Sequence, residues 1–361
     1  MNSSTQITRR RFAAVGMAGA LLLPGMSAFA DAISSATISN EGGMVDGAKF
    51  KKKGPYRIGF SNGFSGNTWR TEMLASLNAE VKRHSDIKDL IIVDGQGDIT
   101  KQVNDIDNLA AQDVDAILCI ANSGTAVVPA LARANREGII TAPFNLPVAG
   151  TEWTTFIGTD PTKKGHALGK WLHDTLGGKG KILGLGGIPG NSYTAAAWAG
   201  AKMALEGSGI EVLAFRDAMW QEDKAKVVTA DLIAAYPEID GVWADGGQDA
   251  AGAVLALLAA NRPLCPVTGD DFNGLIKLYA KYHTSQPKFD IGLMSDPTWE
   301  SVVALRATLT LLRGGNVAKR MIITPRLITS ANYMSYIKPN LPDGVFVDTD
   351  LSDAELEKLF G

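Results

Sequence analysis

Short apolar runs and amphipathic segments alternate along the chain from residue 57 onward. Arg57–Ser61 (RIGFS) is an apolar run that ends at Asn62-Gly63, which predicts a strand. In Thr68–Arg83 apolar residues recur at three- and four-residue spacing, which predicts a helix. The alternation predicts further strands at Leu90–Val93, Ala116–Ile120 and Ile139–Phe144, and helices at Ile99–Gln112 and Ala126–Arg136.

The same pattern restarts after residue 150. Its predicted strands are Thr155–Gly158, Lys181–Leu185, Glu211–Phe215, Gly241–Ala244, Val267–Gly269 and Asp290–Leu293, and its predicted helices are 162–176, 193–206, 222–235 and 249–260. Apolar strands that alternate with amphipathic helices are typical of parallel sheets covered by helices on both faces. The sequence therefore predicts an α/β protein with two similar, doubly wound lobes.

Polar loops follow the predicted strands. In doubly wound sheets ligands bind beyond the carboxyl ends of the strands, so these loops are the candidate site. They include Ser61–Phe64, Asp94–Gln96, Ala121–Gly124, Phe144-Asn145, Gly187–Ser192, Asp245–Gln248, Asp270–Asn273 and Ser295-Asp296, with the aromatic residues Trp69, Tyr193 and Trp198 close by. Amides and carboxylates pair with sugar hydroxyls, and an aromatic face suits the apolar side of a sugar ring.

Residues 1–30 have the features of an export signal. They contain no Asp or Glu, and Arg9–Arg11 precede the apolar run Phe12–Leu23 and Ala28-Phe29-Ala30. This run is too short for a membrane span, so we expect a signal cleaved after Ala30 and a periplasmic protein. Thr8–Phe12 resembles the twin-arginine motif, with an ordinary Sec signal as the alternative. Residues 31–54, rich in Ser, Gly and Ala, are expected to form a mobile leader.

Length and composition exclude several classes of protein. A chain of 361 residues, 45% of them hydrophobic and 20% charged, is long enough for two domains with their own cores. Its 35 Lys+Arg against 38 Asp+Glu exclude a bulk electrostatic nucleic-acid binder. Two cysteines, Cys119 and Cys265, exclude a disulfide scaffold and a four-cysteine zinc site, and no bond between them is expected.

Several motifs resemble the ribose-type periplasmic sugar-binding proteins, the substrate-binding subunits of ATP-binding-cassette (ABC) importers. The motifs are Tyr56–Ser61, Asn67–Arg70, Val114–Leu118, Ile157–Asp160, Ile188–Ser192 and Ala250–Ala253, and the resemblance covers Tyr56 to about Ile337. It implies the type I periplasmic binding protein fold, in which two doubly wound parallel-sheet lobes joined by a three-strand hinge close on one ligand. The boundaries implied are 55–159 with 296–326 for the N-terminal lobe, 160–295 for the C-terminal lobe, and 327–361 for a hinge-crossing tail.

The resemblance also implies a set of ligand-binding residues. They are Asn62, Phe64, Asn67, Trp69, Arg70, Asn122, Asn145, Trp198, Gln248, Asp271 and Ser295. Asn122 has a second interpretation, as the cap of the helix that follows it. Asn145 stands where many relatives have Asp, Trp198 where they have Arg, and Gly246 where they have Asn. These departures favour a less common sugar or a polyol over plain ribose or glucose.

The expected function is therefore capture of a small sugar or polyol by lobe closure and its delivery to the membrane permease of an ABC importer. We expect a monomer that works without cofactor, metal or nucleic acid and that is not an enzyme. Two alternatives remain. The glycine-rich segment Gly184–Gly190 resembles a loose dinucleotide loop, as in an exported cofactor-dependent enzyme. The same fold also serves periplasmic sugar sensors, and the sequence does not name the ligand.

Overall fold

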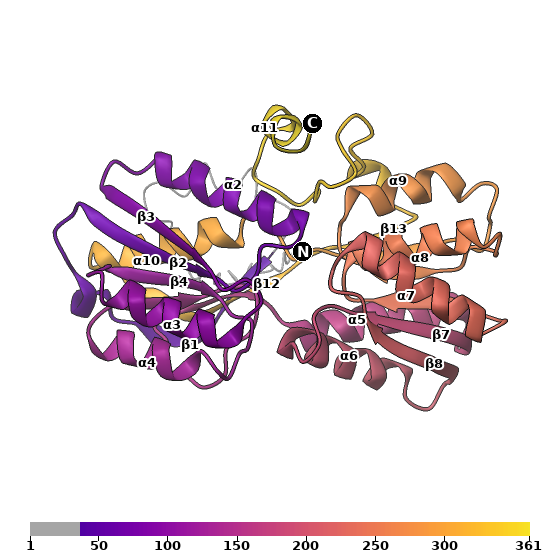
Figure 1. Ribbon diagram of the computed structural model, residues 1–361, viewed down its shortest axis with the longest axis horizontal. Helices are drawn as coiled ribbons and strands as arrows, with labels where there is room; N and C mark the ends of the chain where they lie inside the picture. Colours follow the sequence, from indigo (N-terminus) through magenta and orange to yellow (C-terminus); the bar gives the residue numbers. More distant parts are fainter. Residues whose placement is uncertain (1–36) are drawn as a thin grey trace, which may run out of the picture. The chain divides into compact units, whose positions relative to one another are not determined.

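The computed structural model describes residues 37–361 of the protein (Figure 1). The export signal predicted at residues 1–30 lies outside the described residues. Within residues 37–361 no helix combines the length and the apolar character needed to cross a membrane.

The first lobe is built on a parallel sheet with the strand order β3-β2-β4-β5. Its strands are β2 (Tyr56–Asn62), β3 (Ile87–Asp94), β4 (Ala116–Ile120) and β5 (Ile140–Pro143). An isolated bridge between Phe144 and Ile157 connects β5 to a second sheet of order β1-β12-β6. That sheet contains β1 (Thr37–Val45), β6 (Phe156–Thr159) and β12 (Val317–Thr324).

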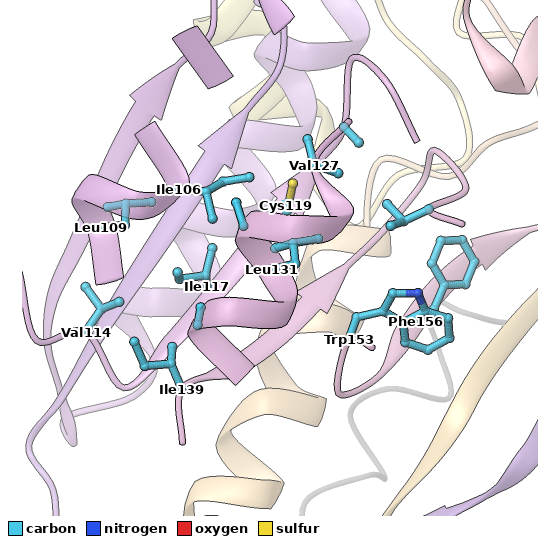
Figure 2. Close-up of a cluster of buried hydrophobic side chains, with 14 of the residues drawn as sticks. Ile106, Leu109, Val114, Ile117, Cys119, Val127, Leu131, Ile139, Trp153 and Phe156 are labelled. Atoms are coloured by element: carbon cyan, nitrogen blue, oxygen red, sulfur yellow. The ribbon is translucent and has the colours of Figure 1, made fainter. Parts of the chain in front are cut away.

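Helices cover both faces of this lobe. They are α2 (Thr68–Lys82), α3 (Ile99–Ala110), α4 (Val128–Arg136) and α10 (Glu300–Leu312). Helix α2 packs against α10, and α3 packs against α4 on the other side of the sheet (Figure 1). Figure 2 shows the cluster beneath α3 and α4, where Ile106, Leu109, Leu131 and other side chains pack on the sheet residues Ile117 and Cys119. Burial of these apolar side chains is the main source of the lobe's stability.

The second lobe is a six-stranded sheet of order β13-β11-β10-β9-β7-β8, parallel except for β13. Its strands are β7 (Lys179–Gly186), β8 (Gly209–Asp217), β9 (Gly241–Ala244), β10 (Val267–Gly269), β11 (Ile291–Met294) and β13 (Leu327–Thr329). Its helices are α5 (Pro161–Leu176), α6 (Ser192–Leu205), α7 (Glu222–Ala235), α8 (Gly247–Ala259) and α9 (Asn273–Tyr282). Helix α5 packs on α6, and α7 on α8.

The chain passes between the lobes three times. It crosses from β6 to α5, returns from β11 to α10, and crosses again from β12 to β13. Asp160 caps α5 by accepting the Lys163 N–H, and Pro161 at the first helical position suits the start of a helix. The carboxyl ends of strands from both sheets therefore meet near these crossings.

The C-terminal segment after β13 contacts both lobes. Asn273 of α9 forms hydrogen bonds with the backbone of Lys338, Leu341 and Pro342. Further on, α11 (Asp353–Phe360) packs on α2 of the first lobe through Leu356 and a small cluster of apolar side chains. Neither α11 nor this packing is predicted from the sequence.

Most predicted elements of the two series are present, with ends shifted by up to three residues. The expectation of a mobile leader over residues 31–54 is wrong for 37–50. There β1 forms an antiparallel pair with β12, and the 3₁₀ helix η2 (Gly47–Phe50) follows. No residue of β1 is buried, so the segment carries no hydrophobic signal. Its backbone is held by β12, which lies far along the chain. Cys119 and Cys265 are both buried and unpaired.

Candidate functional site

A pocket with about 420 Å³ of free space, part of it open to solvent, lies at the strand ends of the two lobes. It is lined by Asn67, Trp69, Arg70, Asn145, Leu146, Tyr193, Trp220, Asp245, Gln248, Asp270 and Asp296. The first five belong to the N-terminal lobe, the next five to the C-terminal lobe, and Asp296 to the second crossing. Polar groups and aromatic rings thus face one another across the pocket. The lining residues of the N-terminal lobe form its first wall, and those of the C-terminal lobe form its second wall.

The start of α2 supplies three of the lining residues. Asn67 caps the helix by accepting the Arg70 N–H at 3.0 Å. Trp69 in the first turn donates its Nε1–H to the carbonyl oxygen of Asp296 at 2.6 Å, so it joins the N-terminal lobe to the second crossing. The cap and the turn together fix the direction in which Trp69 and Arg70 point.

Arg70 brings a buried cation to the first wall. Its Nη1 donates to Asn62 Oδ1 at 2.9 Å, and Asn62 also donates to Ser65 Oγ at 2.7 Å. Burial lowers the pKa of the guanidinium to about 10, so Arg70 stays charged at neutral pH. Among residues 37–361 no carboxylate lies within ion-pair distance of it, which leaves guanidinium donors for a ligand.

Asn145 follows β5 and carries a second amide into the same wall. Its backbone has a φ of 62°, a left-handed conformation that Asn tolerates better than most residues. Its Nδ2 donates to Glu300 Oε2 at 2.9 Å. Burial raises the pKa of the Glu300 carboxyl well above its usual range, and nearby Asp296 raises it further.

Asp296 connects three segments at the crossings. Its Oδ2 accepts hydrogen bonds from Lys164 Nζ and from the Tyr193 hydroxyl, each at 2.5 Å, and its Oδ1 accepts from Thr159 Oγ1 at 2.5 Å. Burial on its own lowers the pKa of Lys164, but the carboxylates of Asp296, Asp270 and Asp245 outweigh it and raise that pKa above its ordinary value. Lys164 is therefore a permanently charged partner for Asp296.

Trp220 and Asp245 form the next part of the second wall. Asp245 follows β9 and accepts from Trp220 Nε1 at 2.9 Å and from Thr194 Oγ1 at 2.7 Å. Burial raises the pKa of Asp245 to about 6 against these hydrogen bonds. A Cβ on Gly187 would lie 2.0 Å from the Trp220 ring, so only glycine lets the indole approach the backbone there.

Asp270 follows β10 and lines the pocket beside Asp245. Its Oδ1 accepts the Gly247 N–H at the start of α8 at 2.6 Å. Burial raises the pKa of its carboxyl to about 7, while the Lys164 ammonium opposes the shift. Gln248, in the first turn of α8, donates to Thr68 Oγ1 of the other lobe at 3.0 Å.

Five of the residues expected at the site line this pocket. They are Asn67, Trp69, Arg70, Asn145 and Gln248. Asn62 lies behind the wall and positions Arg70. Asn122 is also a supporting residue, because its Nδ2 donates to the carbonyl oxygen of Gly63 at 2.7 Å, and it does not cap α4. Phe64 packs over Gly66 instead of lining the pocket.

Three expected residues have other partners and do not line the pocket. Trp198 lies in a ring cluster, 4.9 Å from Phe215 and 5.0 Å from Trp243 between ring centroids. Asp271 is fully buried and accepts the Asp348 N–H at 2.6 Å. Ser295 donates its hydroxyl to Asp348 Oδ2 at 2.6 Å. In both loops the adjacent residue, Asp270 or Asp296, faces the pocket instead.

Several lining residues are absent from the expected set. These are Leu146, Tyr193, Trp220, Asp245, Asp270 and Asp296. Five of them occur in, or next to, the strand-end loops that the pattern identifies, so a signal for the loop exists but not for the residue. Trp220 has no such signal, since its loop follows the long strand β8 at the edge of the sheet. Within the described residues no group of three His, Cys, Asp or Glu is arranged to hold a metal ion.

Comparison with known proteins places this geometry in context. The model of a protein family described as "Periplasmic binding protein domain" matches residues 58–316. The chain is 27% identical to the ribose import binding protein RbsB of Bacillus subtilis over 216 residues, which cover 59% of this chain and 70% of that protein. It is 30% identical over 185 residues to a xylitol-binding protein of Mycolicibacterium smegmatis, an alignment that spans about half of each protein.

Solved structures show the same fold. An ABC transporter solute binding protein from Thermobispora bispora superimposes with a TM-score of 0.74 at 22% identity, over 84% of this chain and 94% of that one. At this identity the likeness concerns the fold alone.

Proposed function

The chain belongs to the family of periplasmic binding proteins, and we propose that it captures a small sugar or polyol between its lobes and delivers it to the membrane permease of an ABC importer. The observation that carries this proposal is the pocket itself. Amides, carboxylates, a guanidinium and three aromatic rings from both lobes surround one space. A ligand rich in hydroxyls can donate to and accept from such a wall at many points.

Relatives in the family support a binding role without catalysis. The ribose and xylitol in the names of two relatives are both small polyhydroxylated molecules, which is the ligand class proposed here. The protein acts in the periplasm as a monomer, after export by the twin-arginine route and cleavage after Ala30. Replacing Arg9 and Arg10 by Lys then blocks export, whereas normal periplasmic accumulation of that variant indicates the Sec route.

A thermal-shift screen of pentoses, hexoses, their acids and polyols identifies the ligand, because binding to the folded state raises the melting temperature. Calorimetric titration of two tryptophan variants then locates the site. Trp69→Ala removes a pocket ring and is expected to weaken binding at least about tenfold. The matched control Trp198→Ala removes a ring outside the pocket, so its affinity stays within about twofold.

Two results contradict the proposal. One is a screen in which no sugar or polyol, amino-substituted forms included, stabilises the protein. The other is a Trp69→Ala variant that binds the identified ligand as tightly as the wild type, which would place the ligand elsewhere.

A further inference from the structure

The two walls of the pocket differ in charge. Asp245 and Asp270 line the second wall, Asp296 lines the pocket at the second crossing, and the ammonium group of Lys164 forms an ion pair with Asp296 at 2.5 Å. In residues 37–361 neither Asp245 nor Asp270 has a cation within ion-pair distance. Their hydrogen-bond donors are neutral: Thr194, Trp220 and the Gly247 N–H. Two carboxyls therefore have no ion-pair partner, and the Lys164 ammonium acts on them only from a longer distance.

The other cation of the pocket does not compensate them. Arg70 lies on the first wall, bonded to Asn62, and the carboxyls that act on it are Asp94 and Glu300. The start of α8 offers only the partial positive charge of a helix N-terminus. Behind Asp245 that helix also carries Asp249, a fully buried carboxyl to which no side chain donates.

Asp270 presents an open acceptor to the pocket. The residue is 9% exposed, and of its two carboxylate oxygens only Oδ1 accepts a hydrogen bond within the described part of the chain. Burying a carboxylate without a partner is costly, and removing that cost needs a cation or a strong donor. The rings of Tyr193 and Trp220, 6.2 Å apart, border the same space, and aromatic faces attract cations.

We propose that the ligand carries a basic amine, as an amino sugar or an aminopolyol does, and that its ammonium group lies between Asp245 and Asp270. This inference rests on the proposed function and narrows its ligand class. An ammonium has three donors, which suits two adjacent carboxyls, and charge-assisted hydrogen bonds are about twice as strong as neutral ones. The hydroxyls of the same ligand face Arg70, Asn145 and the other polar groups of the first wall.

Matched pairs of ligands test the proposal by calorimetric titration at neutral pH. The pairs are D-glucosamine with D-glucose, D-galactosamine with D-galactose, and 1-amino-1-deoxy-D-sorbitol with D-sorbitol. At least one amine is expected to bind at least about tenfold more tightly than its hydroxyl twin. The proposal is overturned if the tightest binder of the set is neutral, and equally if none of the three amines binds.

Isosteric variants test whether charge is the cause. Asp245→Asn and Asp270→Asn keep the shape and one acceptor oxygen, which can still take the Trp220 Nε1–H or the Gly247 N–H, but remove the negative charge. Each is expected to weaken amine binding at least about tenfold and to leave the neutral twin within about threefold. The control Asp240→Asn makes the same change of net charge in the α7–β9 loop, where Asp240 accepts the Lys181 N–H. An equal loss for amine and neutral twin shows recognition of a hydroxyl and contradicts the proposal.

The two proposals fail in different ways. Tight binding of a neutral sugar or polyol, with its amine twin weaker, rejects the amine and keeps the sugar-binding function. A wider screen in which neither class binds rejects both.

Discussion

The ion pair between Lys164 and Asp296 lies buried at the crossings, and its carboxylate also accepts from Tyr193 and Thr159. Replacing Lys164 by Met leaves Asp296 buried with no countercharge. Removing one partner of a buried pair typically costs about 3–5 kcal/mol. We expect Lys164→Met to lower the free energy of unfolding by about that amount in urea denaturation of the unliganded protein.

The double variant Lys164→Met/Asp296→Asn separates charge from packing. It removes both charges, so most of the loss is expected to be recovered. A double variant no more stable than Lys164→Met would show that lost packing, and not an unpaired carboxylate, destabilises the single variant.

Asp270 makes the stability of the unliganded protein depend on pH. Its pKa of about 7 in the folded state lies above the ordinary value near 4, so the folded state holds this proton more tightly than the unfolded chain does. This contribution to stability is complete below about pH 4 and is lost as the pH rises through 7. Asp245, whose pKa is about 6, acts in the same direction.

Asp270→Asn removes this dependence. The variant is expected to melt higher than the wild type at pH 8, by about 2–4 °C for each kcal/mol gained, and to show a smaller difference at pH 5. Scanning calorimetry without ligand measures both. If the difference in melting temperature between the variant and the wild type is the same at pH 5 and at pH 8, the Asp270 carboxyl is solvated in solution.

At the level of elements, the C-terminal segment supplies the hydrogen-bond partner of two residues expected at the site, Asp271 and Ser295. Asp348 accepts hydrogen bonds from Ser295 and from Trp299 Nε1, and its own N–H binds Asp271. Glu72 of α2 accepts the Phe346 N–H, while Phe346 also packs on Phe272 of the other lobe. The segment therefore packs on the loops after β10 and β11, on the side that faces away from the pocket.

Docking of α11 on α2 depends on Leu356. This side chain is fully buried in a cluster with Leu341, Val345 and Leu351. Leu356→Ala is expected to cost about 2–5 kcal/mol in urea denaturation, as for other buried leucines. Lys358→Ala, an exposed site of the same helix, should change stability by no more than about 0.5 kcal/mol. Equal midpoints for the two variants would show that α11 is not docked in solution.

In the molecule as a whole, side-chain hydrogen bonds join the two lobes beside the pocket. They run from Gln248 to Thr68 and from Gln221 Nε2 to the Gly66 carbonyl at 3.1 Å, while Trp69 donates to the Asp296 carbonyl at the second crossing. Gln221 does not line the pocket, so it affects binding only through the arrangement of the lobes.

Gln221→Ala therefore tests lobe closure separately from ligand contact. Loss of one hydrogen bond, about 0.5–1.5 kcal/mol, is expected to raise the Kd about two- to tenfold. Gln112→Ala, a surface change in the first lobe, is the control and should leave the Kd unchanged. Small-angle scattering should show a smaller radius of gyration with ligand than without. An unchanged scattering profile at saturating ligand would contradict closure.

Hydrophobic periodicity alone predicts the two lobes and most of their strands and helices. That information is local, because a buried parallel strand must be apolar along its length and a covering helix must be apolar on one face. It also identifies the strand-end loops as the site. The strand β1 is the exception, since exposed backbone pairing at a sheet edge leaves no apolar pattern.

Which side chain of each loop faces the pocket is set by contacts distant in the sequence. Successive residues at a strand end point to opposite sides, so Asp270 and Asp271, or Ser295 and Asp296, cannot be told apart by composition. Asp348, 77 residues beyond Asp271, forms hydrogen bonds with Asp271 and Ser295 and so holds them away from the pocket. Lys164 and Tyr193 donate to Asp296 and hold it in the pocket. Trp198 likewise lies outside the site, where its ring packs against Phe215 and Trp243. The strands and helices are determined by the short-range pattern of apolar residues. The side chains that line the pocket are determined by hydrogen bonds and ion pairs between buried polar groups, which form only once the chain has folded.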